Sequence, residues 1–212
     1  GVIDGAISIG DVDEDGDIDI ILSGQNVANL NVGRLDRYIN DGTGHFIVTS
    51  FGEHTKFGNS SALGDLDADG DLDLIVMGIG AGFSYRMDRY ENGGAGNFSA
   101  AMAFGVGLLK GAVSLGDVDN DGDIDLVAVG EGPGFLARLD LYLNVRPGVL
   151  AGPIPFGDGV RNGRGSSVLG DIDNDGDLDI FVSGQNAAFV GSLTLYFNHT
   201  AIHNASPGAP AN

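Results

Sequence analysis

The stretch DVDEDGDID at residues 11–19 contains five aspartates, and three close copies of it recur along the chain. The copies are DLDADGDLD, DVDNDGDID and DIDNDGDLD at residues 65–73, 117–125 and 171–179, and we call the four segments loops 1 to 4. Successive loops start 54, 52 and 54 residues apart, and each is preceded by glycine and followed by an apolar run. A fixed motif recurring at this period indicates a repeat protein in which every unit carries the same loop.

The spacing of the acidic side chains within each loop suits a hard cation. Carboxylates stand at positions 1, 3, 5, 7 and 9, and the glycine at position 6 allows a sharp turn because it reaches positive φ without a Cβ clash. Calcium accepts about six to eight oxygen ligands in a flexible geometry, whereas magnesium keeps more of its water. Zinc and copper are disfavoured because the chain has no cysteine and the loops have no histidine.

We therefore predict about four bound Ca²⁺, one in each loop. The side chains at positions 1, 3, 5 and 9 are the predicted ligands. By analogy with other calcium loops, position 7 should add its backbone carbonyl while its side chain points outward. The predicted metal-binding residues are Asp11, Asp13, Asp15, Asp17, Asp19, Asp65, Asp67, Asp69, Asp71, Asp73, Asp117, Asp119, Asp121, Asp123, Asp125, Asp171, Asp173, Asp175, Asp177 and Asp179.

Two other interpretations of the loops are weaker. An EF-hand needs a glutamate at position 12 and flanking helices, but position 12 is apolar in every loop and the flanks are β-branched and strand-like. A merely solvated acidic hairpin would crowd several carboxylates into one turn, which costs free energy that nothing in the turn requires. The loops are thus predicted to join two strands and to hold a metal.

Each repeat is predicted to contain up to four strands and no helix. A short strand enters the loop, an apolar strand leaves it, and a third strand follows at residues 33–40, 85–92, 137–144 and 191–198. A weaker fourth segment follows in the first three units, as at residues 45–50 and 97–102, whereas the fourth unit lacks it. The second strands are apolar on both faces, as expected for sheets covered on both sides.

Four-stranded units of this kind predict an all-β fold, a β-propeller of about four blades that stands alone or forms part of a larger propeller or assembly. A linear β-solenoid is the alternative, but its coils are usually shorter than this repeat. In the third strands arginine and aspartate two residues apart share a face with a tyrosine: Arg34, Asp36 and Tyr38; Arg86, Asp88 and Tyr90; Arg138, Asp140 and Tyr142. We expect these residues to pack blade against blade, with ligand binding by the tyrosines as the alternative; in the fourth unit they become Ser192, Thr194 and Tyr196.

The composition of the chain disfavours nucleic-acid-binding and membrane-spanning proteins. The 212 residues carry a formal net charge of −20, and 20 of the 30 acidic residues are the loop aspartates, so that nucleic-acid binding is disfavoured. Cysteine is absent, and no apolar run is long enough to span a bilayer. Because the first residue is glycine, we expect a processed or partial product. Secretion is favoured because loops of ordinary affinity fill with calcium outside cells, and sequons at Asn59, Asn97, Asn198 and Asn204 would permit glycosylation.

The fourfold D-x-D-x-D-G-x-x-D loop, together with the pairs Phe57-Gly58, Phe104-Gly105 and Phe156-Gly157, resembles the FG-GAP/VCBS family, which includes the propeller repeats of integrin α-chains and of many bacterial secreted proteins. The resemblance extends from residue 6 to about residue 198. It implies calcium at the blade edge between the first two strands and a role in adhesion or ligand binding. The expected layout is one domain at residues 1–198, with repeats near 6–60, 61–112, 113–166 and 167–198, and an irregular tail at 199–212. The family usually builds six to eight blades, so four repeats leave closure open.

The favoured function is that of an extracellular calcium-binding module for adhesion or recognition of a protein or glycan ligand at the cell surface, with calcium in a structural role. A structural subunit of an extracellular filament, joined by strand exchange between copies, is the first alternative. A non-catalytic domain of a secreted carbohydrate-active enzyme is the second. Enzymatic activity is not expected, because no hydrolase motif occurs and His45, His54, His199 and His203 lie in non-equivalent turns or in the tail.

Overall fold

The computed structural model describes residues 1–30, 32–52 and 57–199, and for residues 58–59 and 161–164 it describes the backbone alone. His54, His203 and the predicted tail from residue 200 onward therefore lie outside the described residues. Among the described residues, no helix has both the length and the apolar character that crossing a membrane requires.

The described chain is all-β apart from two short 3-10 helices. Units 1 and 2 each form an antiparallel meander of four strands, in the orders β1-β2-β3-β4 and β5-β6-β7-β8. Their strands are β1 (Val2–Gly10), β2 (Asp19–Asn26), β3 (Gly33–Asn40), β4 (Phe46–Gly52), β5 (Phe57–Gly64), β6 (Asp73–Ile79), β7 (Tyr85–Tyr90) and β8 (Met102–Ala103). Helix η1 (Ala81–Phe83) connects β6 to β7. The third strands thus lie where the sequence predicts them.

Units 3 and 4 share one long strand. Unit 3 consists of β9 (Leu109–Gly116), β10 (Asp125–Gly132), η2 (Pro133–Phe135), β11 (Leu136–Asn144) and the first part of β12 (Leu150–Gly170). The second part of β12 begins unit 4, which continues with β13 (Asp179–Gln185) and β14 (Gly191–Tyr196). Unit 4 therefore has three strands within the described chain. The fourth strand expected at residues 97–102 is shorter than predicted, since β8 pairs with β7 through only two residues.

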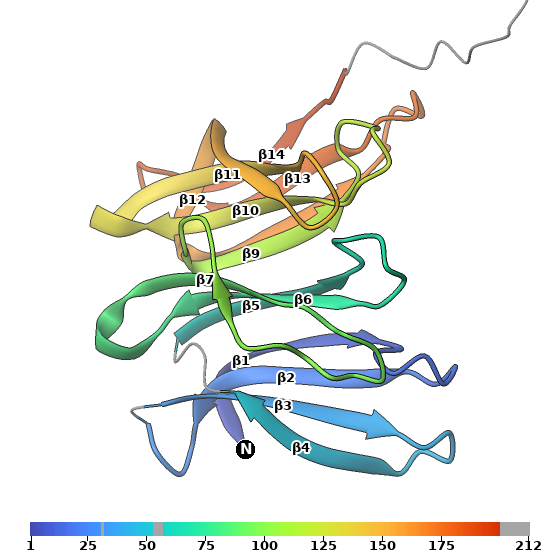
Figure 1. Ribbon diagram of the computed structural model, residues 1–212. Coiled ribbons are helices and arrows are strands. Elements are labelled where there is room, and N and C mark those ends of the chain that lie inside the picture. Colours follow the sequence, from blue (N-terminus) through green and yellow to red (C-terminus); the bar gives the residue numbers. More distant parts are fainter. Residues whose placement is uncertain (31, 53–56, 200–212) are drawn as a thin grey trace, which may run out of the picture.

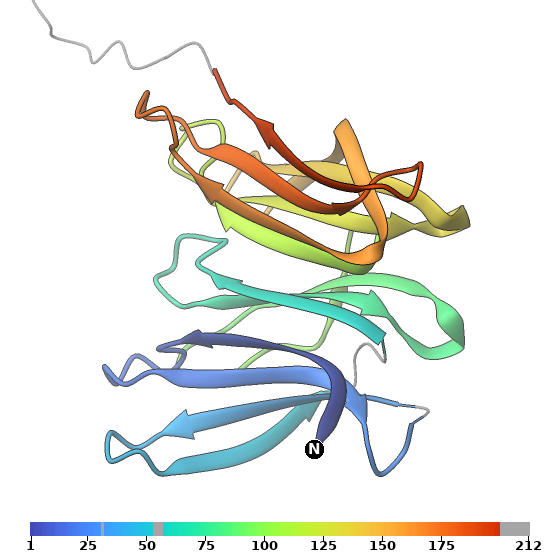
Figure 2. The ribbon, with the colours of Figure 1, turned by 180° about the vertical axis from the view of Figure 1, so that it is seen from behind.

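The four sheets are stacked face to face, with unit 1 at one end and unit 4 at the other (Figures 1 and 2). The first strands of successive units, β1, β5, β9 and the second part of β12, lie next to one another. The N-terminus and residue 199 are at opposite ends of this stack. The described chain is thus an open stack of blade-like sheets, and no closed ring is formed by it.

Hydrophobic cores fill the spaces between successive sheets. Three separate clusters lie between units 1 and 2, units 2 and 3, and units 3 and 4. Strands β6 and β10 are buried along their whole length, because both faces of the two middle sheets are covered. In β2 and β13, which belong to the end sheets, buried and partly exposed residues mix. Burying such aliphatic side chains contributes about 1.5–3 kcal/mol each, so that the interfaces between sheets stabilise the stack.

Phe-Gly pairs join each sheet to the next, but the first of them is not the predicted one. The ring of Phe104 meets that of Tyr142 from the next unit at 5.9 Å, edge to face, and Phe156 and Tyr196 meet in the same way. In unit 1 this partner of Tyr90 is Phe51, followed by Gly52, rather than the predicted Phe57-Gly58. The glycine is needed because Gly105 has φ of +59° and a Cβ there would lie 2.7 Å from the Tyr142 ring. These tyrosines are therefore packing residues.

The arginine and aspartate residues predicted to share a face form ion pairs within their own strand. Nitrogen–oxygen distances are 2.7 Å for Arg34 and Asp36, 2.6 Å for Arg86 and Asp88, and 2.7 Å for Arg138 and Asp140. The three aspartates are buried beneath partly exposed guanidinium groups. The pairs thus allow a carboxylate to enter the space between two sheets.

Candidate metal centres

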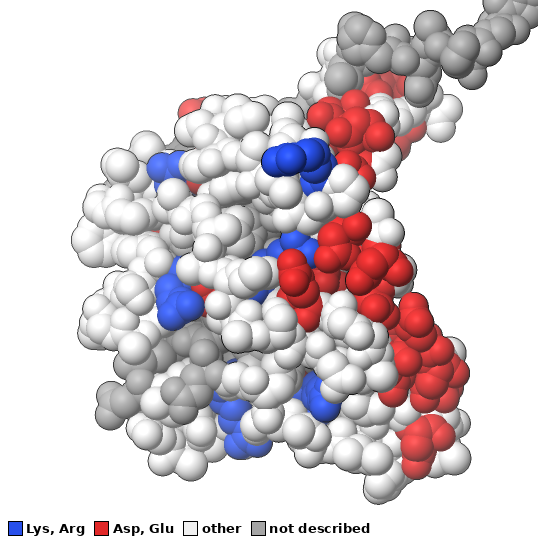
Figure 3. Space-filling view, in the orientation of Figure 1, with Lys and Arg blue, Asp and Glu red and all other residues white. Residues whose placement is uncertain are grey.

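Loops 1 to 4 join the first strand to the second in each sheet, and the stacking places all four at the same edge. Acidic side chains consequently gather in a continuous ridge along one side of the molecule (Figure 3). Some basic side chains adjoin this ridge, and others lie away from it. Stacking therefore concentrates carboxylates that are about fifty residues apart in sequence.

The backbone of every loop follows the same path. The glycines at position 6 have φ between +93° and +100°, which confirms the prediction of a left-handed residue there. Position 4 also has positive φ, near +60°, in Glu14, Ala68, Asn120 and Asn174. Sequence reasoning missed this second left-handed position. Only the two asparagines signal it, because asparagine tolerates this region better than glutamate or alanine.

The aspartates at positions 1 and 5 hold the turn together. In loop 2, Asp65 accepts hydrogen bonds from the backbone N–H groups of Asp69 and Gly70 at 3.2 and 3.1 Å, and Asp69 accepts one from the N–H of Asp71 at 3.0 Å. The same three bonds occur in the other loops. A carboxylate has about four lone-pair sites, so these bonds leave acceptor capacity for a metal.

Position 9 anchors each loop to the rest of its sheet. The four aspartates here are fully buried, and each accepts the N–H of position 2 and the N–H of the asparagine that follows or ends the third strand. The asparagine side chain donates to the carbonyl of position 8 and, in units 2 to 4, also to the position-2 carbonyl of the preceding unit. These residues are Asn40, Asn92, Asn144 and Asn198. The sequence analysis missed their role, although an asparagine ends every predicted third strand.

The aspartates at position 3 give the clearest indication that the loops can bind a cation. Oδ1 of Asp13, Asp67 and Asp119 is buried and has no hydrogen-bond partner in the described part of the chain. Burial, reinforced by repulsion from neighbouring aspartates, raises the pKa of these three carboxyls. A buried carboxylate oxygen without a donor is costly, and a divalent cation would satisfy it. The residues present therefore fit a hard cation bound through oxygen.

Each loop brings three of its four predicted side-chain ligands together, with ligand atoms within 4.8 Å of one another. In loops 1 and 2 these residues are at positions 1, 3 and 5, and in loops 3 and 4 they are at positions 1, 3 and 9. The position-7 side chains do not belong to these clusters. Asp177 differs from the predicted outward direction, because it is buried and accepts a hydrogen bond from Asn120 of the preceding loop.

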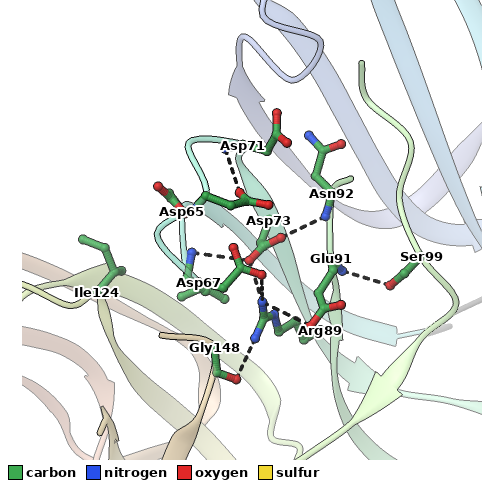
Figure 4. Close-up of polar contacts among 12 residues, drawn as sticks. Asp65, Asp67, Asp71, Asp73, Arg89, Glu91, Asn92, Ser99, Ile124 and Gly148 are labelled. Atoms are coloured by element: carbon green, nitrogen blue, oxygen red, sulfur yellow. Dashed lines mark hydrogen bonds and ion pairs between the residues drawn. The ribbon is translucent and has the colours of Figure 1, made fainter. Parts of the chain in front are cut away.

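Loop 2 contains a fixed positive charge. The Arg89 guanidinium, almost completely buried, lies 2.9 Å from both Asp67 and Asp73 and donates to the carbonyl of Gly148 in unit 3. Figure 4 shows the two carboxylates on the same side of Arg89 and Asp71 directed away from it. Burial raises the pKa of Asp73 to about 6, although backbone hydrogen bonds and Arg89 lower it. The sequence analysis placed this arginine on a strand but not at the loop.

His199 lies beside loop 4. Its Nδ1 is 3.4 Å from a carboxylate oxygen of Asp175, and Asp173, Asp175 and His199 form a further group whose ligand atoms lie within 4.8 Å. All three residues are exposed. His199, which the sequence places at the start of the tail, thus lies within reach of loop 4, because the chain leaving β14 passes the loop.

Comparison with known families identifies the repeat. A family model described as FG-GAP-like repeat matches residues 11–76 and 117–182, which together make up more than half of the chain. Each matched segment runs from the start of one loop into the second strand of the following unit. No curated protein matches the sequence significantly.

Proposed function

Because the chain belongs to the FG-GAP-like repeat family, we propose that it is a calcium-binding repeat module for adhesion or recognition outside the cell. The observation that carries the metal assignment is the buried, unpartnered position-3 oxygen that recurs in loops 1, 2 and 3. Calcium fits better than magnesium because each loop offers several carboxylate and carbonyl oxygens, and calcium takes more protein oxygens than magnesium, which keeps its waters. The clusters would hold it through Asp11, Asp13 and Asp15 in loop 1 and through the equivalent groups in the other loops.

The proposed role of calcium is structural. The loop aspartates already fix the turn through backbone hydrogen bonds, and the position-9 carboxylates tie each loop to its third strand. A bound cation would offset the mutual repulsion of the remaining carboxylates and so stabilise the edge where the loops lie. We do not expect catalysis, since the acidic groups are engaged in this framework.

Calorimetric titration of metal-stripped protein with calcium tests the proposal. About four sites are expected, and magnesium at the same concentration should bind more weakly. A titration without calcium binding would overturn the metal assignment. Binding of the calcium-loaded chain to cell-surface glycans and proteins, compared with binding after chelation, tests the recognition role separately.

A structural subunit of an extracellular assembly remains the second candidate. The observation in its favour is the open stack, whose two end sheets each have one face that no other described sheet covers. Strand β14 is also the last strand of its sheet in the described chain. Such an edge can pair with a strand of another chain.

A further inference from the structure

The outer face of unit 4 exposes the residues that every other unit buries. Leu193 is 74% exposed, whereas its equivalents Leu35, Met87 and Leu139 are at most 2% exposed. Ile172 at position 2 of loop 4 is also exposed, although position 2 is buried in loops 1 to 3. A shallow apolar hollow of about 260 Å³ lies on this face and is lined by Ser166, Ser167, Val168, Phe181, Ser183 and Leu193. The face thus has the composition of an internal interface.

The outer face of unit 1 is the corresponding opposite half. Ile7 and Ile9 are each 66% exposed, and Ile18 is exposed as well. In the later units the equivalents of Ile9 are Leu63, Leu115 and Leu169, which are partly buried and pack against the cores between sheets. Unit 1 therefore ends in the same kind of surface that units 2 to 4 present to the preceding unit.

The two end faces are complementary at the glycine before each loop. A methyl group on Gly10, Gly64 or Gly116 would lie 2.7 to 2.9 Å from a leucine of the next sheet, namely Leu72, Leu115 or Leu178. At Gly170 no described atom lies within 4 Å. The residues that would fill this space by repetition are isoleucines of unit 1, Ile9 and Ile18, and both are exposed.

The first strands add a second match. Ser8 and Ser61 share a hydrogen bond of 2.6 Å across the first interface, and Ser114 and Ser167 share one of 2.7 Å across the third. At the second interface the same positions are apolar, Ala62 and Val113, which belong to one core. Polar and apolar pairs therefore alternate along the stack, and the next pair in the series would be Val168 with Ile7, both apolar and exposed.

The asparagines provide a polar match. Asn92, Asn144 and Asn198 each donate to the position-2 carbonyl of the preceding unit. Asn40 of unit 1 donates to the carbonyl of Ile18 at position 8 of its own loop, as the other asparagines do in theirs. No unit precedes it in the described chain. Stacking on another unit 4 would give Asn40 the carbonyl of Ile172 as its second acceptor.

We propose that the outer face of unit 4 binds the outer face of unit 1 of a second copy of this chain, head to tail, and so continues the stack. Such a heterologous contact closes into a ring if the rotation between copies allows it and otherwise forms an open array. Association should depend on protein concentration, because the contact joins separate copies of the chain. This proposal goes beyond the proposed function and does not depend on recognition of a ligand.

Sedimentation velocity of the 212-residue calcium-loaded chain over a range of concentrations tests the proposal. The wild-type mass should rise to at least two chains. Leu193→Asp and Ile9→Asp should each remain monomeric, because each places a charge in one of the two apolar faces. Phe83→Asp is the matched control, since Phe83 is 76% exposed on η1 in unit 2, away from both end faces, and it should associate like the wild type. Unchanged circular dichroism and calcium binding establish that each variant is folded.

Mixing the two interface variants distinguishes head-to-tail stacking from other contacts. Leu193→Asp keeps an intact unit 1 face and Ile9→Asp keeps an intact unit 4 face, so an equimolar mixture should form a dimer of one copy of each and nothing larger. If Ile9→Asp retains the wild-type mass, the contact does not use unit 1 and the proposal fails. A wild-type chain that stays monomeric at all concentrations also overturns it, whether or not calcium binds.

Discussion

Loops 2 and 3 have aspartates at the same five positions, yet the strand beside each loop gives them different electrostatic surroundings. In unit 2 the third strand places Arg89 against Asp67 and Asp73. The equivalent residue in unit 3 is Leu141, which packs against the core between units 3 and 4. Loop 2 therefore has a protein cation within its cluster, whereas loop 3 has none among its described contacts.

The loop positions whose ligand atoms lie close together also differ, and the difference follows whether the third strand carries arginine or leucine. Loops 1 and 2, whose third strands carry Arg37 and Arg89, gather positions 1, 3 and 5. Loops 3 and 4, with Leu141 and Leu195 instead, gather positions 1, 3 and 9. In loop 2 the Arg89 guanidinium already compensates part of the negative charge that would attract a metal. We expect calcium to bind more weakly at loop 2 than at loop 3.

The largest effect should come from removing calcium. Binding to the folded chain alone stabilises it by about 2.7 kcal/mol per site at a hundredfold excess over Kd, so chelation should lower the melting temperature markedly. Hydrogen exchange should increase more in loop 3 than in loop 2, because Arg89 continues to hold Asp67 and Asp73 without metal. Calorimetry and exchange mass spectrometry measure the two effects. Equal loss of protection in both loops would contradict the comparison.

A smaller effect is expected from single substitutions in loop 3. Asp119→Ala removes the buried, unpartnered position-3 oxygen and should weaken calcium binding at this loop by about a hundredfold or more, roughly 2.7 kcal/mol. Asp123→Ala retains the position-7 carbonyl and is the matched control, with a much smaller expected loss. Titration calorimetry should show one site fewer for Asp119→Ala only. Equal losses would show that the assignment of ligand positions is wrong.

Exchanging the residues at positions 89 and 141 should make the calcium affinities of loops 2 and 3 more alike. Arg89→Leu should raise the calcium affinity of loop 2 by about tenfold, roughly 1.4 kcal/mol, and Leu141→Arg should lower that of loop 3. In the absence of calcium, Arg89→Leu should be less stable than the wild type, because it leaves buried carboxylates uncompensated.

Arg86→Leu is the control for this exchange. It removes the same charge from the same strand, but Arg86 pairs with Asp88 rather than with the loop. Its calcium affinity should therefore stay near that of the wild type. If Arg86→Leu and Arg89→Leu raise the affinity equally, net charge rather than the position of Arg89 determines the difference.

Much of the fold could be predicted because its determinants are local and repeated. The loop motif fixes where the first strand ends and the second begins, and the burial of β6 and β10 follows from their apolar sequences. The choice of Phe51 rather than Phe57 could not be predicted. Both precede a glycine, and only packing against Tyr90 of the next sheet distinguishes them. Closure was also beyond prediction, since the angle between sheets depends on side chains that meet across the whole interface.

The site could be predicted in composition but not in detail. Aspartates in the loop signal a cation, yet the reach of Arg89 from β7 to Asp67 depends on the relative placement of strand and loop. The asparagines that tie neighbouring units were overlooked because a single polar residue at a strand end has many ordinary roles. Their hydrogen bonds to the preceding unit became apparent only once the sheets were stacked.

The last expected effect is the pH dependence of the calcium-free protein. The pKa of Asp73 is raised to about 6, so that between the unfolded value of 3.8 and about 6 the folded state binds more protons than the unfolded state. Stability without calcium should therefore increase as pH falls from 7 toward 4, by up to about 1.4 kcal/mol per unit of pKa shift. With calcium the trend should reverse, because protons compete with the metal for the same carboxylates.

Two substitutions test whether this carboxyl is responsible. Asp73→Asn should reduce the gain in calcium-free stability on acidification, as measured by thermal melting between pH 7 and 4. Asp41→Asn should instead increase the gain in calcium-free stability on acidification. Hydrogen bonds from Thr43 lower the pKa of Asp41, so the wild type loses that stabilisation as pH falls and the variant does not. If Asp73→Asn keeps the full wild-type slope, the proton uptake belongs to other carboxyls, such as the position-3 aspartates, and Asp73 does not distinguish loop 2 from the rest.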